Sequence, residues 1–346
     1  MPRPGNLFIF FAATLLAAAS AIGQDVKLRV VDVGAGLCVV ATTSDGHAMV
    51  YDTGAGSARC GDAVGELVSS KKIDLLALSH SDIDHIGAAR RILAENDVST
   101  IIHPGDPRDG TAIARVRHDI NQEPGASIID LSAMNLPFGA EFAVGPAAVT
   151  LIAGWSDPTK IYDQDPSLDG SGHKAERYNG ISIVMRLSYG GHSILLTGDT
   201  LGRIEGTRKD DTLCQYAERK MVENSAAVPL ESDILIGQHH GSDDSSSNCF
   251  IRAIKPRWVI FSAGHEYKHP RQSAADRFLS FGVLKERMLR TDRGDHEGGR
   301  GRGKEWRFGG LRGCVDQPGD DDVEITLSPD PIVEPIVEYR TKKVGC

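Results

Sequence analysis

The segment 80–85, with the sequence HSDIDH, constrains this chain more than any other feature. It places two imidazoles and two carboxylates directly after the apolar run 73–78, which predicts a buried strand. Neutral imidazole and carboxylate are the nitrogen and oxygen ligands that divalent metals prefer. The segment therefore predicts a metal site at a strand end, with His80, Asp82 and Asp84 on one side of an extended loop. His85 would follow where the chain enters a helix.

Three later apolar runs also end in polar residues that can bind a metal or a substrate. They lead to the motif TGD at 197–199, the motif HHGS at 239–242 and the segment 262–270, which ends in His-Pro. Glycine allows a sharp turn before Asp199, whose two oxygens can each bind one cation. Because functional side chains gather on loops that follow strands, the four strand ends together predict one site for two divalent metals.

Along most of the chain, segments with the apolar pattern of strands and segments with the periodicity of helices follow one another, and turn residues separate them. Strands are predicted at 27–32, 37–42, 48–51, 73–78, 100–103, 148–152, 181–189, 192–197, 233–237, 258–262 and 323–327, and helices at 62–70, 88–94, 111–120, 212–224 and 273–281. The runs 75–78 and 194–197 are apolar throughout, as in strands covered on both faces. Two strand-rich halves, each followed by helices, predict an α/β fold with two sheets packed face to face and helices outside, a four-layered αββα sandwich.

The first residues have the pattern of a secretory signal peptide: Arg3, then an apolar run, then small residues. We therefore predict a signal peptide at 1–23, with cleavage after Ala21 or Gly23, and a secreted or periplasmic protein. An uncleaved membrane anchor is the alternative, but the apolar run is short for a full span. No later segment has the apolar character of a membrane span, so we expect no membrane insertion after cleavage.

Six cysteines fit an oxidising compartment, in which disulfides form. Their spacing is wide and contains no CxxC pair, so a zinc knuckle is not predicted. A bond between Cys314 and Cys346 is a candidate that would hold the C-terminal tail. Cys38 lies in an apolar run and is predicted to be a buried thiol. The full connectivity stays open, because six cysteines allow many pairings.

The net charge of −9 argues against a general nucleic-acid binder, because such binding depends on neutralising phosphates. A local exception is the segment 300–312, whose basic residues are interleaved with glycine; we interpret it as a solvated loop, with a flexible basic lip as the alternative. The segment 156–176 is rich in Asp, Pro, Ser and Gly and predicts a long surface loop near the site. We expect one main domain at 24–300 and a partly irregular C-terminal extension at 301–346.

The motif HxDxDHxG at 80–87, followed by TGD, HHGS and the final His-Pro, resembles the metallo-β-lactamase superfamily. More narrowly, this set is similar to the metal-dependent hydrolase domain attached to the DNA-uptake competence protein ComEC. The segments VDVGAG at 31–36 and DTG at 52–54 also match that branch. The resemblance covers residues 27–295 and implies the αββα fold and hydrolase chemistry. Its motifs are much less specific for a substrate.

The resemblance implies a set of ligands for two metals: His80 and Asp82 for the first, Asp84 and His85 for the second, Asp199 as the bridge, and His240 as the remaining ligand of the second. His239 would then face the substrate. The roles of His239 and His240 can be exchanged, because adjacent residues of an extended chain point to opposite sides. His269 matches a family position near the substrate, where it can contact a phosphate or a hydroxyl.

Two positions depart from the usual superfamily pattern, which has histidines where this chain has Asp82 and Asn179. The ComEC-like branch similarly has Asn at the second position. Replacing an imidazole by a carboxylate adds a hard, negatively charged ligand to the first metal position. Oxygen-rich sites suit Mn²⁺ or Mg²⁺ better than sites of imidazole alone. We therefore predict two divalent cofactor ions, Zn²⁺ or Mn²⁺, with a weaker first position that accepts Mn²⁺.

The resemblance to the ComEC-like branch implies a metal-dependent hydrolase, a phosphodiesterase or nuclease that would use a metal-bound hydroxide, and the signal peptide implies that it is secreted. Asp84 would orient the attacking water and accept its proton, and His239 or His269 would donate a hydrogen bond to the developing oxyanion. The negative charge favours a small or single phosphoester and leaves a nucleic-acid substrate open. One alternative is hydrolysis of a lactone, thioester or amide, including a β-lactam. Another is a non-catalytic, metal-dependent binding protein.

Other polar residues are expected to have structural roles. His47 and His192 lie at predicted hairpin turns and should be exposed. Asp52 ends a strand and should brace the loop around the metals rather than bind one. The serines of segment 242–247 should cap the helix that follows.

Overall fold

The structure is a computed structural model that describes residues 24–56, 58–106, 108, 110–134, 136–156, 174–203, 213–293, 303–306 and 319–341. The helices of this part of the chain are α1 (Ala58–Leu67), α2 (Ile83–Ile86), α3 (Ala89–Glu95), α4 (Thr111–Gln122), α6 (Lys174–Gly180), α7 (Tyr216–Asn224), α8 (Asn248–Ile254) and α9 (Gln272–Ser280). The strands form two large sheets and one short two-stranded ladder of β4 (Lys72–Ile73) and β6 (Asp97–Val98).

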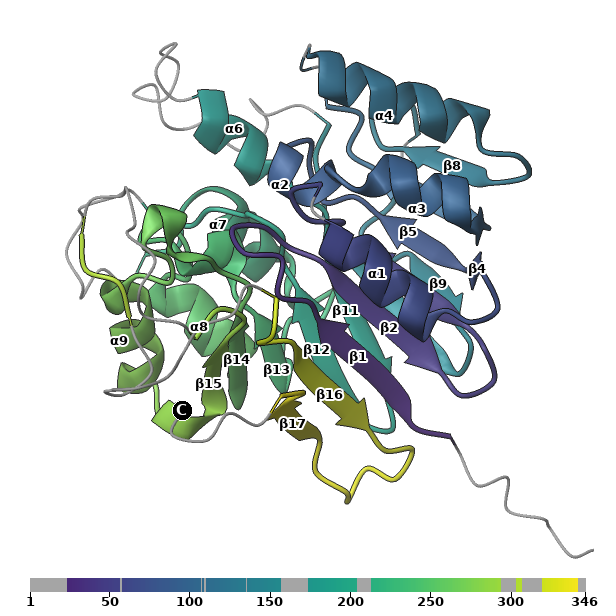
Figure 1. Ribbon diagram of the computed structural model, residues 1–346. Coiled ribbons are helices and arrows are strands. Elements are labelled where there is room, and N and C mark those ends of the chain that lie inside the picture. Colours follow the sequence, from purple (N-terminus) through teal and green to yellow (C-terminus); the bar gives the residue numbers. More distant parts are fainter. Residues whose placement is uncertain are drawn as a thin grey trace, which may run out of the picture.

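The first sheet has the strand order β17-β16-β1-β2-β3-β5-β7-β8. Its strands are β1 (Val26–Val30), β2 (Val39–Thr43), β3 (Ala48–Tyr51), β5 (Leu75–Ala77), β7 (Thr100–His103), β8 (Ser127–Asp130), β16 (Val323–Leu327) and β17 (Ile336–Tyr339). The strands from β3 to β8 are parallel because helices connect them. These helices, α1, α3 and α4, lie on one face of the sheet (Figure 1).

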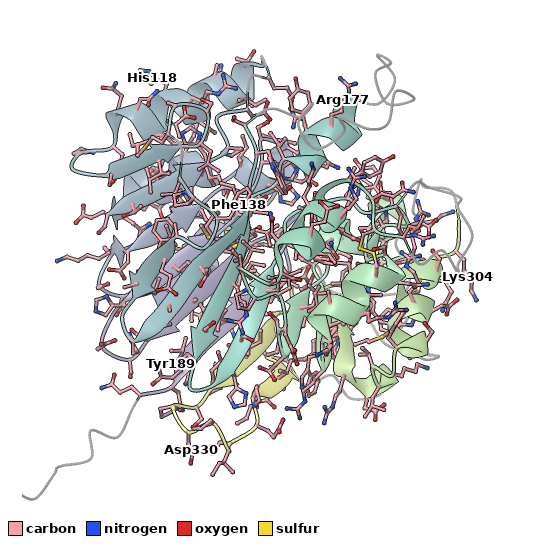
Figure 2. All side chains as sticks on the ribbon, turned by 180° about the vertical axis from the view of Figure 1, so that it is seen from behind. His118, Phe138, Arg177, Tyr189, Lys304 and Asp330 are labelled. Carbon is pink, nitrogen blue, oxygen red and sulfur yellow. A yellow bond between two sulfur atoms is a disulfide. The ribbon has the colours of Figure 1, made fainter. Side chains whose placement is uncertain are left out.

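The second sheet has the order β15-β14-β13-β12-β11-β10-β9. Its strands are β9 (Glu141–Val144), β10 (Ala147–Ala153), β11 (Val184–Tyr189), β12 (His192–Leu196), β13 (Ile234–Ile236), β14 (Trp258–Phe261) and β15 (Met288–Arg290). The strands from β12 to β15 are parallel, and α7, α8 and α9 connect them. Their carboxyl ends therefore share one edge of the sheet. Figure 2 shows Arg177 of α6 at one end of the molecule and Tyr189, which ends β11, at the other.

Three apolar layers hold the four structural layers together. The central layer lies between the sheets and includes the fully buried Tyr51 and Ile236. A second layer packs α1, α3 and α4 on the first sheet, and a third packs α7, α8 and α9 on the second, with Phe250 and Phe278 at its centre. Each buried aliphatic or aromatic side chain of this size stabilises the fold by about 1.5–3 kcal/mol. The predicted αββα sandwich is thus confirmed.

The C-terminal segment contributes to the first sheet. β16, a strand predicted from the sequence, pairs antiparallel with β1 in the register Val26↔Leu327, and β17 pairs with β16 at the edge. In Figure 1 the yellow β16 lies beside the purple β1, although the two are at opposite ends of the sequence. Part of the predicted extension at 301–346 is therefore integral to this sheet. Of the basic segment 300–312, only 303–306 belongs to the described residues.

Five strands of the described residues were not predicted: β6, β8, β9, β15 and β17. β9 and β17 are half exposed and carry charged residues, so their apolar patterns are weak. The run 73–78 was expected to be one strand. The chain instead forms two strands, β4 and β5, which are separated by Asp74. The Asp74 carboxylate accepts a hydrogen bond from the backbone N–H of Ala48, and this bond fixes Asp74 to β3.

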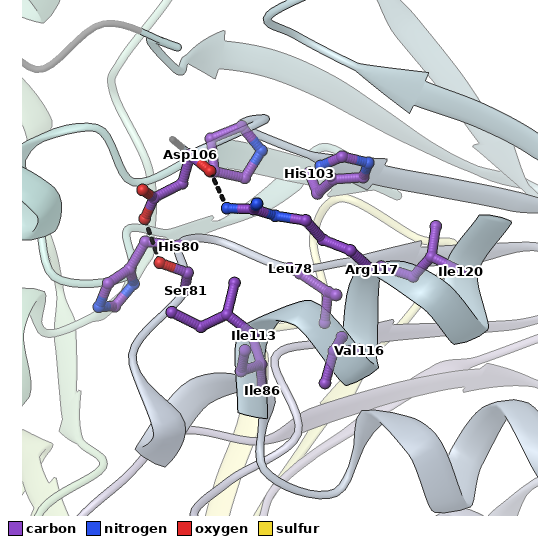
Figure 3. Close-up of a pocket in the computed structure, with 11 residues that line it drawn as sticks. Leu78, His80, Ser81, Ile86, His103, Asp106, Ile113, Val116, Arg117 and Ile120 are labelled. Atoms are coloured by element: carbon purple, nitrogen blue, oxygen red, sulfur yellow. Dashed lines mark hydrogen bonds between the residues drawn. The ribbon is translucent and has the colours of Figure 1, made fainter. Parts of the chain in front are cut away.

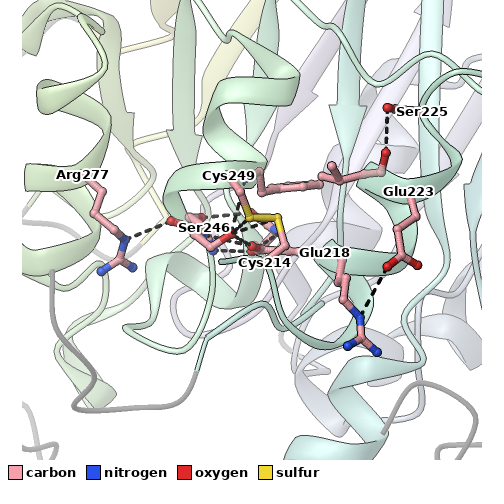
Figure 4. The surroundings of a disulfide bond; sticks show 12 residues. Cys214, Glu218, Glu223, Ser225, Ser246, Cys249 and Arg277 are labelled. Atoms are coloured by element: carbon pink, nitrogen blue, oxygen red, sulfur yellow. Dashed lines mark hydrogen bonds and ion pairs between the residues drawn. A yellow bond between two sulfur atoms is a disulfide. The ribbon is translucent and has the colours of Figure 1, made fainter. Parts of the chain in front are cut away.

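The cysteine predictions need correction. Cys38 is not a free thiol, because it forms a buried disulfide with Cys60 that joins the segment before β2 to α1. A second disulfide joins Cys214 to Cys249 at the start of α8 (Figure 4). The sequence contains no signal for these pairings, since they depend on which helix packs on which strand. The predicted pair Cys314–Cys346 lies outside the described residues.

Two further expectations concern exposure and membranes. His192 was expected to be exposed, but it is buried beside the loop between β16 and β17, where its Nε2 donates a hydrogen bond to the backbone oxygen of Val333. Among the described residues, no helix combines the length and the apolar character that a membrane span requires. The predicted signal peptide at 1–23 and most of the predicted loop at 156–176 lie outside the described residues.

Candidate metal centre

The candidate centre lies where strand ends of the two sheets meet. β5 is followed by the HSDIDH segment, β12 by Gly198 and Asp199, and β13 by His239 and His240. Because β12 and β13 are parallel neighbours, their carboxyl ends lie side by side, and the end of β5 approaches from the opposing sheet. The face-to-face packing of the sheets therefore brings together residues more than a hundred positions apart.

Backbone hydrogen bonds from two glycine-containing loops fix the HSDIDH segment. The backbone N–H of Leu37 donates to the oxygen of Asp84 (3.1 Å), and that of Thr53 donates to the oxygen of His85 (2.6 Å). A Cβ on Gly36 would lie 2.6 Å from the Asp84 oxygen, so only glycine fits this approach. Asp84 itself belongs to the short helix α2, whereas the sequence placed it in an extended loop.

All six predicted metal ligands converge around the carboxylate of Asp199. Its oxygens lie 3.2 Å from Nε2 of His85, 3.4 Å from Nε2 of His240 and 4.0 Å from Nε2 of His80. Nε2 of His80 also lies 3.4 Å from the Asp82 carboxylate, and Nε2 of His240 lies 3.5 Å from the Asp84 carboxylate. Two overlapping groups result, one of His80, His85 and Asp199 and one of Asp84, His85 and His240.

Each of these imidazoles is oriented by a hydrogen bond on its other nitrogen. Nδ1 of His85 lies 2.8 Å from Asp52, and Nδ1 of His240 donates to the backbone oxygen of Ser262 (2.6 Å). Nδ1 of His80 lies 3.0 Å from the Ser79 hydroxyl, which itself donates to Asp52. Asp52 thus has the bracing position predicted for it. With Nδ1 engaged, Nε2 of each ring can act as a ligand, as in protein metal sites generally.

Two buried atoms at the centre support a cation there. Within the described residues, Nε2 of His80 and Oδ1 of Asp199 have no hydrogen-bond partner, and both residues are buried. A buried polar atom without a partner costs about 1–3 kcal/mol. A divalent metal would satisfy both atoms, since carboxylate oxygen and imidazole nitrogen are its usual ligands. The residues present therefore fit a metal site.

The pKa values of the cluster reflect a strong attraction between its carboxylates and its imidazoles. Burial raises the pKa of Asp199, but His240, His85 and His239 outweigh it and hold this pKa well below its usual value. Burial lowers the pKa of His240, but Asp199 and Asp84 raise it to about 10. In the absence of metal, protons on His85 and His240, whose pKa values are raised, offset the charge of the carboxylates. Metal binding at this cluster would displace those protons.

The two adjacent histidines do not point to opposite sides. His239 and His240 have left-handed backbone conformations, with φ of 45° and 55°, instead of the extended conformation assumed from the sequence. Both rings therefore face Asp199, with Nε2 of His239 at 3.8 Å and that of His240 at 3.4 Å. Such conformations are costly in residues other than glycine and cluster at functional sites.

His240 and His239 nevertheless have different surroundings. His240 lies against His85 and Asp84, whereas Nε2 of His239 lies 3.1 Å from Nδ2 of Asn179 and its Nδ1 lies 2.9 Å from Asp244. The structure thus places Asn179 at the edge of the cluster. The ring of His269 lies 5.7 Å from that of His239 and 6.3 Å from that of His240, measured between centroids.

Most of the side chains that surround the cluster had no recognisable signal in the sequence; Ser247 is the exception. Arg108 pairs with Asp82, and its guanidinium stacks on Tyr178. The buried carboxylate of Glu218 accepts hydrogen bonds from the side chain of Gln238, beside the two histidines, and from the backbone of Ser246 (Figure 4). The hydroxyl of Ser247 accepts from the first turn of α8, as predicted for a capping serine. Only the folded chain brings these residues together.

A small pocket lies beside the HSDIDH segment, between that segment and α4 (Figure 3). Its lining is mostly apolar and includes Leu78 and Val116. At its polar end, the hydroxyl of Ser81 donates to the carboxylate of Asp106. His103, whose Nδ1 accepts a hydrogen bond from Gly105, also lines this pocket rather than the metal cluster.

Comparison with known proteins identifies the family. Residues 31–265 match the model of the family described as the metallo-beta-lactamase superfamily, which covers more than half of the chain. Competence protein ComA of Neisseria gonorrhoeae is 27% identical over 273 residues, which are 78% of this chain and 31% of that protein. ComE operon protein 3 of Bacillus subtilis (strain 168) is 24% identical over 231 residues, 64% of this chain and 24% of that protein.

The chain thus spans about a third of the first relative and about a quarter of the second. Among solved structures, it is similar to the metallo-beta-lactamase fold protein YhfI from Bacillus subtilis, with 14% identity, a TM-score of 0.43 and coverage of 77% of this chain and 95% of that one. CmlA, a diiron beta-hydroxylase from Streptomyces venezuelae, has 12% identity, a TM-score of 0.46 and coverage of 88% and 54%. By its match to the family model, the chain belongs to the metallo-beta-lactamase superfamily, and within it is a metal-dependent hydrolase similar in sequence to competence proteins.

Proposed function

We propose that this chain is a phosphodiesterase or nuclease that works with two divalent cations. One observation carries the proposal: two groups of imidazole and carboxylate ligands overlap at His85, the Asp199 carboxylate of the first group lies 3.4 Å from His240 of the second, and buried ligand atoms there lack partners within the described residues. His80, Asp82 and Asp199 would hold the first cation. Asp84, His85, His240 and Asp199 would hold the second. When bound, such a pair of cations acidifies water and neutralises charge on a phosphoryl group.

The side chains around the cluster can supply the remaining chemistry. Asp84 is partly exposed and reaches His240 with one oxygen, so it can orient a water molecule and accept its proton. In the metal-free protein, burial lowers the pKa of His239, but Asp244 and Asp199 raise it to about 9. The Asp244 carboxylate, 2.9 Å from Nδ1, favours a charged ring that can donate a hydrogen bond from Nε2 to a developing oxyanion. His269 lies next to His239 and can contact the same substrate group.

The metal preference follows from the donor set. At the first position a carboxylate, Asp82, replaces an imidazole, and Asn179 lies at the edge of the cluster instead of a histidine. Because oxygen-rich sites favour harder cations, we propose that Mn²⁺ supports activity at least as well as Zn²⁺ does. An enzyme that is active with zinc and inert with manganese would contradict this part of the proposal.

The substrate class rests on the resemblance to the hydrolase domain of a DNA-uptake competence protein. The net charge of −9 favours a small or single phosphoester over a long polyanion. The test is a comparison of bis-p-nitrophenyl phosphate, plasmid DNA, a lactone and a β-lactam as substrates, each with Mn²⁺, with Zn²⁺ and with a chelator. We expect metal-dependent hydrolysis of the phosphodiesters. Turnover of the lactone or β-lactam alone would assign the site to the alternative class, and metal binding without any turnover would indicate a binding protein.

We also propose that the protein is exported. The amino-terminal pattern of a signal peptide supports this, and the Cys38–Cys60 and Cys214–Cys249 disulfides fit an oxidising compartment. Fractionation of the native producing cells, with amino-terminal sequencing of the recovered protein, tests it. A cytoplasmic protein that retains its first residues would refute export.

A further inference from the structure

We propose that Arg108 and Tyr178 form a phosphate-binding subsite beside the first metal position. The inference rests on the proposed function and deepens it, because it assigns the recognition of the phosphoryl group to particular residues. Neither residue belongs to the motifs that define the family resemblance. Arg108 lies between β7 and α4, and Tyr178 lies in α6, so the two come from different halves of the chain.

The guanidinium of Arg108 is held on three sides. Its Nε donates to the Asp106 carboxylate at 3.2 Å, its Nη1 donates to the Asp82 carboxylate, and its Cζ lies 3.9 Å from the centre of the Tyr178 ring. Stacking on an aromatic ring fixes the plane of a guanidinium and adds cation–π attraction. Arg108 is therefore oriented before any substrate arrives.

Hydrogen bonds also fix the position of Asp106, which holds Arg108, and of the Arg108 backbone. The carboxylate of Asp106 accepts a hydrogen bond from the hydroxyl of Ser81, a residue of the HSDIDH segment (Figure 3). The guanidinium of Arg117 on α4 donates to the backbone oxygens of Asp106 and Arg108. The position of Arg108 is thus coupled directly to the segment that supplies four of the predicted metal ligands. A substrate-binding cation needs this kind of support to be accurately placed.

One donor of Arg108 remains for a ligand. Within the described residues, Nη2 is buried and has no hydrogen-bond partner, whereas Nε and Nη1 are occupied. Guanidinium groups bind phosphate oxygens with strong, directional hydrogen bonds. The Asp82 carboxylate connects the Arg108 guanidinium to the cluster. Its Oδ1 accepts a hydrogen bond from Arg108, and its Oδ2 lies 3.4 Å from Nε2 of His80. A phosphoryl group at the cluster would therefore be next to this cation.

Two divalent cations would neutralise the carboxylates of the centre overall, so the contribution of Arg108 is local, beside Asp82. Asp82, Asp84 and Asp199 together place three carboxylates where an anionic phosphodiester must approach. Arg108 offsets part of this negative charge on the side of Asp82. The ion pair between Arg108 and Asp82 also fits the departure from the usual superfamily pattern at position 82. A guanidinium pairs with a carboxylate, but not with the neutral imidazole that is usual there.

The test separates phosphate recognition from support of Asp82. We would measure binding of inorganic phosphate to the metal-loaded, full-length mature protein by calorimetry, and metal content by mass spectrometry, for wild type, R108A and R108K. Kinetics with bis-p-nitrophenyl phosphate and the neutral ester p-nitrophenyl acetate would accompany them. We expect R108A to raise the Kd for phosphate and the KM for the diester about tenfold or more, since one charged hydrogen bond is lost. R108K should restore part of this, and Y178L should show an intermediate effect.

The control is R115A, which removes an exposed arginine from α4 and should leave phosphate binding unchanged. An unchanged Kd for phosphate in R108A would overturn the inference. So would an equal loss on the neutral ester, or metal loss in both R108A and R108K without a phosphate-specific effect. Because phosphate binding is measured without turnover, a wild-type protein that hydrolyses no phosphodiester would refute the proposed function separately.

Discussion

The carboxylate of Asp52 lies 2.8 Å from Nδ1 of His85, and both side chains are fully buried. The same carboxylate accepts hydrogen bonds from the backbone N–H and the hydroxyl of Ser79, which in turn contacts His80. One buried group thus orients a histidine of each predicted metal position. The predicted centre therefore depends on a residue that is not itself one of its predicted metal ligands.

Replacing Asp52 by Asn should weaken metal binding by about 10–100-fold, because the ring of His85 loses the partner that fixes its orientation and increases its basicity. Competition with a chromogenic chelator would measure the affinity. The matched control is D74N, since Asp74 lies 3.1 Å from Nδ1 of His47 in a similar pair away from the centre. Equal metal affinities for wild type and D52N would show that the Asp52–His85 contact is only structural.

Replacing Asp199 by Ala should release metal and lower turnover by roughly a thousandfold or more, because this carboxylate contacts the rings of His80, His85 and His240 at once. Metal analysis after gel filtration and the rate with bis-p-nitrophenyl phosphate would measure the two effects. D233N is a suitable control, since Asp233 precedes β13, away from the site edge of the same sheet. Near-normal rates in D199A would rule out two cations sharing this carboxylate.

Replacing Gly198 by Ala should destabilise the fold by about 1–3 kcal/mol and disturb the centre. Gly198 has φ of +52°, and an added Cβ would lie 2.8 Å from Cβ of Ser79, so both backbone and packing oppose the change. Urea unfolding would measure the loss. In G125A the backbone is also left-handed, but the new methyl group meets nothing within 4 Å. G198A should therefore be clearly less stable than G125A, and equal stabilities would contradict the packing argument.

A buried histidine outside the centre predicts how stability depends on pH. Nε2 of His265 lies 3.1 Å from Asp292, and Nδ1 lies 2.5 Å from Glu305. Burial lowers the pKa of His265, but the two carboxylates outweigh it and raise this pKa from 6.5 to about 9. Because the folded state binds the proton more tightly than the unfolded state, the stabilisation is complete below about pH 6.5 and is lost as the pH rises through about 9.

The free energy of unfolding should therefore fall by about 2–3 kcal/mol more in wild type than in H265Q between pH 6 and pH 10. Urea unfolding of the metal-free proteins at both values would measure it. H118Q serves as a control, because His118 is exposed on α4 and its replacement should leave the pH dependence unchanged (Figure 2). Parallel pH profiles for wild type and H265Q would show that the ion pairs of His265 contribute nothing.

Strands were predictable where their apolar pattern is clear, either on both faces, as in β3, or at alternate residues, as in β16. β3, β7 and β16 occur at the predicted residues, and β12 ends one residue earlier than expected. Edge strands were missed where one face is solvated, as in β9 and β17, since their hydrophobic pattern is faint. The disulfide between Cys38 and Cys60 was missed for another reason: it depends on the packing of α1 against the first sheet, which no local pattern encodes.

By itself, the sequence determined which residues gather at the centre, because polar residues that follow buried strands in two sheets meet where the strand ends meet. Only the tertiary structure decided the left-handed backbone of His239 and His240, the brace from Asp52 and the pairing of Arg108 with Asp82. These features arise from contacts between segments that are distant along the chain. Their geometry depends on how the two sheets and their loops pack, and packing is a property of the whole fold.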